Sequence, residues 1–111
     1  MQISTETFGN VLVAHTPDEF NEDSVHDFLA ALQQSLDSGL VNVVLQMDRS
    51  ESYDSVGLTA LVDLQEQIRD RGGNLKISGL ADPGRKIFEV TRLDQKFDVF
   101  DSIIDAVSSF N

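Results

Sequence analysis

The 111-residue sequence contains no cysteine, and this absence removes several kinds of chemistry. Disulfide bonds, thiol catalysis and thiolate metal sites are excluded, although the compartment is not fixed by cysteine content alone. No apolar stretch approaches the roughly 20 residues that a membrane-spanning helix needs. The first residues, Met1–Glu6, lack both the basic start and the apolar run of a signal peptide. We therefore expect a cytoplasmic protein without a membrane span.

Basic residues are scarce. Eight Lys and Arg stand against 19 Asp and Glu, which gives a formal net charge of -11 at pH 7. Such a chain repels phosphate backbones and anionic headgroups, so direct binding to nucleic acid or to a membrane surface is disfavoured. A basic partner surface is favoured, and the attraction should raise association rates more than affinity. The charge can equally serve solubility alone.

Apolar residues, in contrast, are not scarce. They make up 41% of the sequence and are spread along its whole length, which disfavours disorder. A chain of this length fits one domain and leaves no room for a second. We expect that domain to span residues 1–111.

The first half of the sequence alternates between strand-like and helical patterns. Two runs flank the turn residues Gly9 and Asn10 and predict a hairpin, and an apolar stripe with 3.6-residue spacing predicts a helix after it. The helix would be capped by Asn21 or Ser24 and would end at Gly39. A buried central strand and a polar loop follow. In order, these elements are strands Gln2–Phe8 and Val11–His15, the helix with Val25, Phe28, Leu29, Leu32 and Leu36, strand Leu40–Met47 and loop Asp48–Asp54.

The second half continues the alternation with three helices and two strands. A helix over Asp54–Arg71 would be closed by Gly72 and Gly73, and a third helix would begin with Asp82 as cap and Pro83 in its first turn. The two expected strands are Leu75–Ser78 and Lys96–Phe100. The apolar side of the third helix would consist of Ile87, Phe88 and Val90. A closing helix would be capped by Asp101 or Ser102, and its inward-facing residues would be Ile103, Ile104, Val107 and Phe110.

The resulting order is β-β-α-β-α-β-α-β-α. Strands separated by helices favour parallel pairing with right-handed crossovers, and the initial hairpin adds one antiparallel neighbour. The sequence therefore predicts an α/β fold with a four- to five-stranded mixed sheet and four helices.

The most informative segment is Tyr53–Leu58, which joins the buried central strand to the second long helix. Ser55 lies where that helix begins, and the first-turn N–H groups there lack partners and carry partial positive charge. Asp54 or Ser55 could simply cap the helix. A phosphate on Ser55 would be stabilised at this position by up to about 1 kcal/mol.

This segment resembles the Asp-Ser-Ser/Thr-Gly-Leu motif of anti-sigma factor antagonists of the STAS domain family, in which the serine after the aspartate is phosphorylated. That serine matches Ser55. The resemblance continues in Val43–Leu45, in Arg71–Leu80 and in Leu93–Phe97, which looks like the family's Leu-Asp-x-x-Phe tail. It spans nearly the whole chain and implies the STAS fold.

The resemblance also implies a function in transcription regulation. The unmodified protein would bind an anti-sigma factor that is also a serine kinase, and phosphorylation of Ser55 would end binding until a phosphatase restores it. ATP and Mg²⁺ belong to the kinase, so no cofactor and no enzymatic activity are assigned to this chain. The partner-binding residues that the resemblance implies are Glu19, Phe20, Asn21, Asp54, Ser55, Val56, Gly57 and Phe88.

Three alternatives stay open. Val56 stands where the family has a second hydroxyl, and Asp18–Asn21 replaces its Gly-Glu-Leu-Asp segment, which favours a STAS scaffold or accessory subunit of a transporter or stress-signalling assembly. A receiver-like phospho-acceptor would use Asp48 after the central strand, but its acidic pair and its Lys are missing. A catalytic serine enzyme would need a general base and a glycine before the Ser55 segment, and neither is evident.

Overall fold

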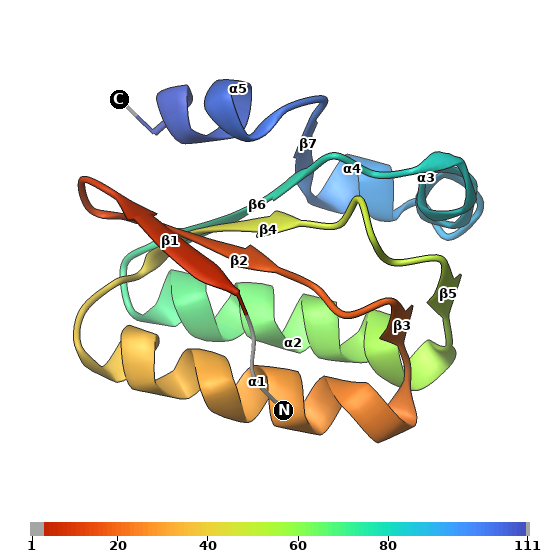
Figure 1. Cartoon of the computed structure of the whole chain (residues 1–111), viewed down its shortest axis with the longest axis horizontal. Helices are drawn as coiled ribbons and strands as arrows, with labels where there is room; N and C mark the ends of the chain where they lie inside the picture. Colours follow the sequence, from red (N-terminus) through yellow and green to blue (C-terminus); the bar gives the residue numbers. More distant parts are fainter. Residues whose placement is uncertain (1–3, 111) are drawn as a thin grey trace.

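Five strands form one mixed sheet in the order β1-β2-β4-β6-β7 (Figure 1). The computed structural model describes residues 4–110. β1 and β2 form an antiparallel hairpin, and the pairs β2–β4, β4–β6 and β6–β7 are parallel. The strands are β1 (Thr5–Phe8), β2 (Val11–His15), β4 (Asn42–Gln46), β6 (Asn74–Ser78) and β7 (Asp98–Phe100).

Helices cover both faces of the sheet. The two long helices, α1 (Glu22–Asp37) and α2 (Ser55–Asp70), lie side by side on one face and begin at the same end of the molecule, whereas α5 (Ile103–Ser108) lies on the other face (Figure 1). Every third or fourth residue of α1 is apolar and buried, so burial of one helical stripe fixes its orientation on the sheet. Those buried residues are Val25, Phe28, Leu32 and Leu36.

Most sequence predictions are confirmed, with boundaries shifted by a few residues. The hairpin, the central strand β4, both long helices and the five-stranded mixed sheet are present. The α1 cap is Asn21, whose side chain accepts from the backbone of Asp23 and Ser24. The cap of α2 is Asp54 rather than Ser55. Gln2 and Ile3, placed in the first predicted strand, lie outside the described residues.

The last third of the fold differs from the prediction. A short helix, α4 (Leu93–Lys96), precedes β7, so Lys96 and Phe97 are not part of the final strand. The cause is local, because Arg92 takes a left-handed conformation with φ 62° and starts a new turn after α3 (Asp82–Val90). Residues 4–110 thus contain five helices, where the sequence predicted four. The cap of α3 is Ala81, without a side-chain hydrogen bond, and Asp82 is already the first helical residue.

Two predicted core residues lie on the surface. Val90 is 75% exposed and Ile104 is 76% exposed. In both short helices the buried face is narrow, and it consists of Gly84 and Phe88 in α3 and of Ala106 in α5. A periodic apolar pattern over six to nine residues cannot by itself decide which of two adjacent apolar residues is buried.

A second, two-stranded sheet was not predicted. β3 (Glu19–Phe20) pairs in parallel with β5 (Ser52–Tyr53) beside the start of α2. Gly57 lies against this small sheet so closely that a Cβ atom there would be 2.2 Å from the backbone oxygen of Phe20. Only a residue without a side chain permits this approach.

We expect Gly57→Ala to destabilise the protein by about 1–3 kcal/mol, because the new methyl group forces α2 away from β3. The loss should occur although alanine is the better helix former. Thr59→Ala, an exposed change two residues along the same helix, is the matched control and should not lower the stability. Urea denaturation of the three proteins checks this, and a Gly57→Ala variant as stable as wild type would show that the close contact is unimportant.

Candidate functional site

Asp54 joins the two long helices at their N-termini. Its Oδ1 accepts the N–H of Gly57 in α2 at 2.8 Å, and its Oδ2 accepts the N–H of Glu22 in α1 at 3.0 Å. One carboxylate therefore caps two helices that are more than 30 residues apart in sequence. The arrangement places two partially positive helix ends side by side around a single anionic group.

The same hydrogen bonds keep the Asp54 carboxyl group ionised. The N–H of Gly57 contributes most, and the N–H of Glu22 adds to it, so that the pKa of Asp54 lies below its usual value despite an opposing effect of partial desolvation. Donors that bind a carboxylate favour its charged form over its protonated form. Asp54 is thus a fixed negative charge immediately before Ser55.

The loop before Asp54 is anchored by buried polar contacts. Ser50 is fully buried, and its hydroxyl donates to the Pro17 carbonyl oxygen at 2.5 Å and lies 2.6 Å from the Thr16 hydroxyl. The Tyr53 hydroxyl donates to the Ser50 carbonyl oxygen at 3.2 Å, and burial raises the pKa of that hydroxyl to about 12, so it remains a donor. No sequence pattern indicates these anchors, because a serine in a charged loop is usually exposed.

Ser55 is the first residue of α2, and its side chain is exposed. It lies at the head of two grooves. One, of about 360 Å³, runs between α1 and α2 over an apolar floor that includes Leu29, Val56 and Ala60. The other, of about 220 Å³, lies on the opposite side of α2 and reaches Leu93. A ligand in either groove would therefore lie beside Ser55.

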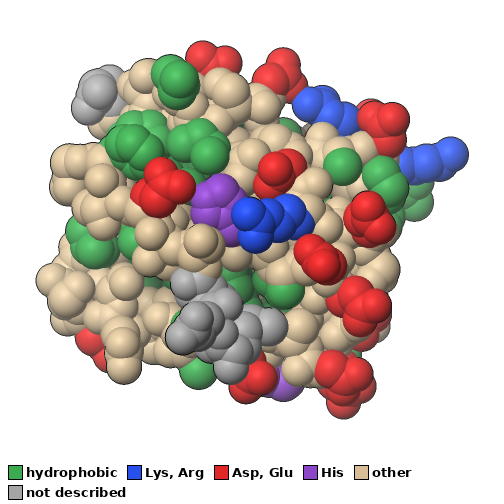
Figure 2. Space-filling model, in the orientation of Figure 1, with side chains coloured by type: hydrophobic (Ala, Val, Ile, Leu, Met, Phe, Trp, Pro, Cys, Tyr) green, Lys and Arg blue, Asp and Glu red, His purple; other side chains and the backbone are tan. Residues whose placement is uncertain are grey.

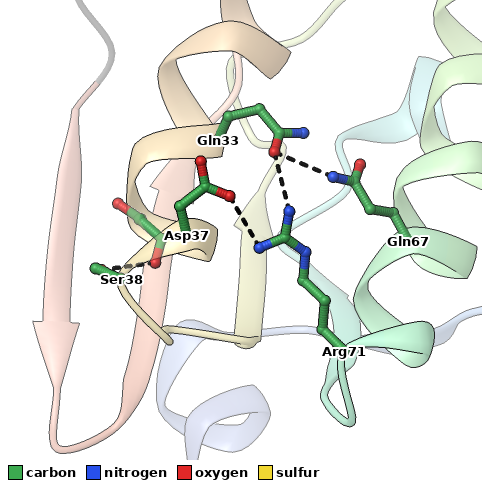
Figure 3. A network of polar contacts seen from close by, with 6 residues as sticks. Gln33, Asp37, Ser38, Gln67 and Arg71 are labelled. Atoms are coloured by element: carbon green, nitrogen blue, oxygen red, sulfur yellow. Dashed lines mark hydrogen bonds and ion pairs between the residues drawn. The ribbon is translucent and has the colours of Figure 1, made fainter.

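The far ends of α1 and α2 are held together by a separate polar network (Figure 3). Arg71 pairs with Asp37 at 3.0 Å and donates to the Gln33 side-chain oxygen at 3.4 Å. Gln67 donates to the same oxygen at 3.1 Å. Polar contacts between α1 and α2 therefore lie at both ends of the groove, at Asp54 and at this network.

The residues that the sequence placed at the partner surface divide into two groups. Glu19, Ser55 and Val56 are exposed, and Asn21 and Asp54 are half-buried as helix caps. Phe20, Gly57 and Phe88 are buried. Phe20 packs edge-to-face on Phe28, and Phe88 lies 6.2 Å from Phe97 between ring centres. These three residues can support the surface from below, but the side chains of Phe20 and Phe88 are not available for contact.

The charge around the site is acidic. All eight Lys and Arg lie between residues 49 and 96, so α1 and the strands before it contain none. Acidic side chains crowd the end of the molecule where α1 and α2 begin (Figure 2). Among residues 4–110, no three acidic or histidine side chains cluster in a way that could hold a metal ion. In the same part of the chain, no helix has the length and apolarity needed to cross a membrane.

Three solved structures resemble this one. A candidate anti-sigma factor antagonist from Thermotoga maritima superposes with a TM-score of 0.87 at 21% identity, over 96% of this chain and 92% of that one. A sulfate transporter family protein from Wolinella succinogenes gives a TM-score of 0.80 at 23% identity, over 94% and 87%. The phosphorylated form of the Bacillus cell fate determinant SpoIIAA gives 0.75 at 14% identity, over 99% and 100%. Likeness at these identities establishes the fold.

No curated protein matches the sequence closely enough to count as a relative. The sequence profile of the STAS domain, however, matches residues 2–106, and this match covers almost the whole chain. This match argues against the receiver-like phospho-acceptor alternative. The chain belongs to the STAS domain family.

Proposed function

We propose that this protein is an anti-sigma factor antagonist, a cytoplasmic regulator of transcription that works by binding. In its unmodified form it binds an anti-sigma factor that is also a serine kinase. Phosphorylation of Ser55 by that partner ends the binding, and a phosphatase reverses the modification. ATP and Mg²⁺ are bound by the kinase and not by this chain.

The observation that carries this proposal is the position of Ser55. Its hydroxyl is exposed at the first residue of α2, on a rigid base formed by the Asp54 caps and by the contact of Gly57 with Phe20. A kinase can reach such a hydroxyl without unfolding the protein. The partial positive charge of the helix end would stabilise the added phosphate by up to about 1 kcal/mol.

Phosphorylation would act on the partner through charge and size. The phosphate adds a charge of about -1.5 to -2 beside Asp54, at the head of both grooves. The exposed Val56, next to Ser55, supplies apolar contact area, while Glu19 supplies charge at the rim. A phosphate in the centre of this surface would have to be desolvated on binding, which is costly unless it is paired.

In a second candidate function, binding is not regulated by phosphorylation of Ser55. In this alternative the chain is a STAS scaffold or an accessory subunit of a transporter or stress-signalling assembly. The replacement of the motif's second hydroxyl by Val56 favours it, as does the fold likeness to a transporter family protein. The two functions differ in whether a charge at position 55 changes binding.

Catalysis by Ser55 is the weaker interpretation. His26 and Asp63 do line the same groove as Ser55, which the sequence did not indicate. Nucleophilic catalysis requires a general base within hydrogen-bond reach of the hydroxyl. The side-chain hydrogen bonds seen at this helix start run from the N–H groups of Gly57 and Glu22 to Asp54, and the Ser55 hydroxyl takes no part in them. We therefore assign Ser55 the role of a phosphate acceptor.

The first test substitutes Ser55. Because Asp54 and not Ser55 caps α2, Ser55→Ala should change the stability by less than about 0.5 kcal/mol while abolishing phosphorylation. Ser55→Asp should keep or slightly raise the melting temperature, since the helix end favours negative charge, and should weaken binding to the cognate anti-sigma factor. Thermal melts and calorimetric titrations measure both effects.

Ser102→Asp is the matched control for the Ser55 test. It places the same charge at the cap of α5, on the other face of the sheet, and should leave binding unchanged. If Ser55→Asp binds the anti-sigma factor as tightly as wild type does, the phosphorylation mechanism is wrong and the scaffold function replaces it.

The second test concerns the shared cap. Asp54→Asn should lower the melting temperature at pH 7, because an amide has one acceptor oxygen and cannot cap both helices. The folded pKa of Asp54 lies below its unfolded value of about 3.9, so its stabilisation is present above that pH and is lost as the pH falls through the folded pKa. The difference in melting temperature between wild type and Asp54→Asn should therefore become smaller below about pH 4. A difference independent of pH would contradict the capping role.

The third test concerns association. Glu19→Lys should slow binding to a basic partner, and the effect should be larger at low salt, where screening is weaker. Asp70→Lys changes the net charge equally but lies at the C-terminal end of α2, far from Ser55, so it controls for the total charge. If the association rate measured by stopped flow falls equally for both variants, the binding surface does not include Glu19.

A further inference from the structure

A third groove, with an apolar lining, lies on the face of the sheet opposite the Ser55 surface. It has a volume of about 200 Å³ and lies between β1 and α5, lined by Phe8, Ile103, Ile104, Val107 and Ser108. Ile104 is 76% exposed and Phe8 is 45% exposed, although both are large apolar side chains. In Figure 2 hydrophobic side chains gather over α5 and the end of β1, with acidic side chains at the border. We call this the β1–α5 groove.

The strand beside this groove has an open edge. Among residues 4–110, β1 is the end strand of the sheet and pairs with β2 alone. The N–H of His15 donates to the carbonyl oxygen of Ser4, which makes this pair a hydrogen-bonded one in the antiparallel ladder. Because such pairs alternate, Glu6 and Phe8 also bond to β2, and the backbone N–H and C=O groups of Thr5 and Thr7 point outward.

The register also decides which side chains stand over the groove. Phe8 lies opposite Val11, and Glu6 lies opposite Val13. Val11 and Val13 belong to the core beneath α5, so Phe8 and Glu6 project from the same face as that helix. An added strand would find free backbone partners at Thr5 and Thr7 and an apolar wall beside Phe8.

The charged side chains at the edge of the β1–α5 groove indicate what kind of ligand it would bind. Glu6 on the strand side and Asp105 on the helix side are exposed, and neither β1, its turn nor α5 contains a Lys or Arg. A second copy of this chain would bring like charges together across a two-fold axis, on top of a net charge of -11 per chain. A basic segment would instead meet opposite charge at Asp105 and at Glu6, whose carboxylate lies 3.5 Å from His15 Nε2.

We infer that the β1–α5 groove binds an extended, basic segment of another protein. The segment adds as a strand to the outer edge of β1, places an apolar side chain between Phe8 and Ile104, and sets its Lys or Arg residues against Glu6 and Asp105. This surface is independent of Ser55, so the protein can hold a second partner whatever the phosphorylation state of Ser55.

The test selects peptides from a phage-displayed library of random linear sequences on the immobilised full-length protein. The best peptide is then synthesised and its affinity is measured for wild type and variants. We expect an apolar residue flanked by Lys or Arg, and binding that weakens as salt is raised. Ile104→Ser should weaken binding at least about tenfold. Thr7→Pro should do the same, because it removes an outward N–H that β2 does not use.

Val90→Ser is the matched control, because Val90 is as exposed as Ile104 and lies in α3. It should leave binding unchanged, as should Ser55→Asp. The inference fails if no selected peptide depends on Ile104, or if the selected peptides lack basic residues. Binding that survives Thr7→Pro refutes the strand pairing. A wild-type dimer that Ile104→Ser dissociates in sedimentation would make the groove an interface between copies of this chain.

Discussion

The arrangement of the site depends on one carboxylate. Asp54 accepts backbone N–H groups from α1 and from α2, and its low pKa keeps it charged and able to accept both. The two helices therefore begin at one point, and the groove between them opens there. Ser55 follows directly and is free to face outward, because capping is already done by its neighbour. Modification of Ser55 therefore leaves the cap of α2 in place.

Other contacts in the fold hold the N-termini of α1 and α2 in place. β3 and β5 hold the two loops that lead into the helices, and Gly57 lets α2 approach β3 to a distance that no side chain would permit. At the far ends, Arg71 and Gln67 tie α2 to α1. A phosphate on Ser55 would change the charge and shape of a preformed surface, and no rearrangement of the helices is needed to explain a loss of binding.

The sequence predicted the larger features because they repeat. The stripe of α1, the apolar run of β4 and the helix start at Asp54 all carry a clear period or cap. Features made by two or three residues escaped prediction. β3 and β5 are too short for a period, α4 depends on the left-handed conformation of Arg92, and the burial of Ser50 depends on contacts with Thr16 and Pro17. The shared cap was also missed, since no local pattern links Asp54 to Glu22.

The central claim is that Ser55 accepts the phosphate that ends partner binding. The most direct measurement is the intact mass and the modification site of the protein after incubation with its cognate anti-sigma kinase and ATP. Our account predicts one phosphate per chain, located on Ser55 and absent in Ser55→Ala. A protein that stays unmodified, or that carries its phosphate elsewhere while Ser55 remains free, would contradict it.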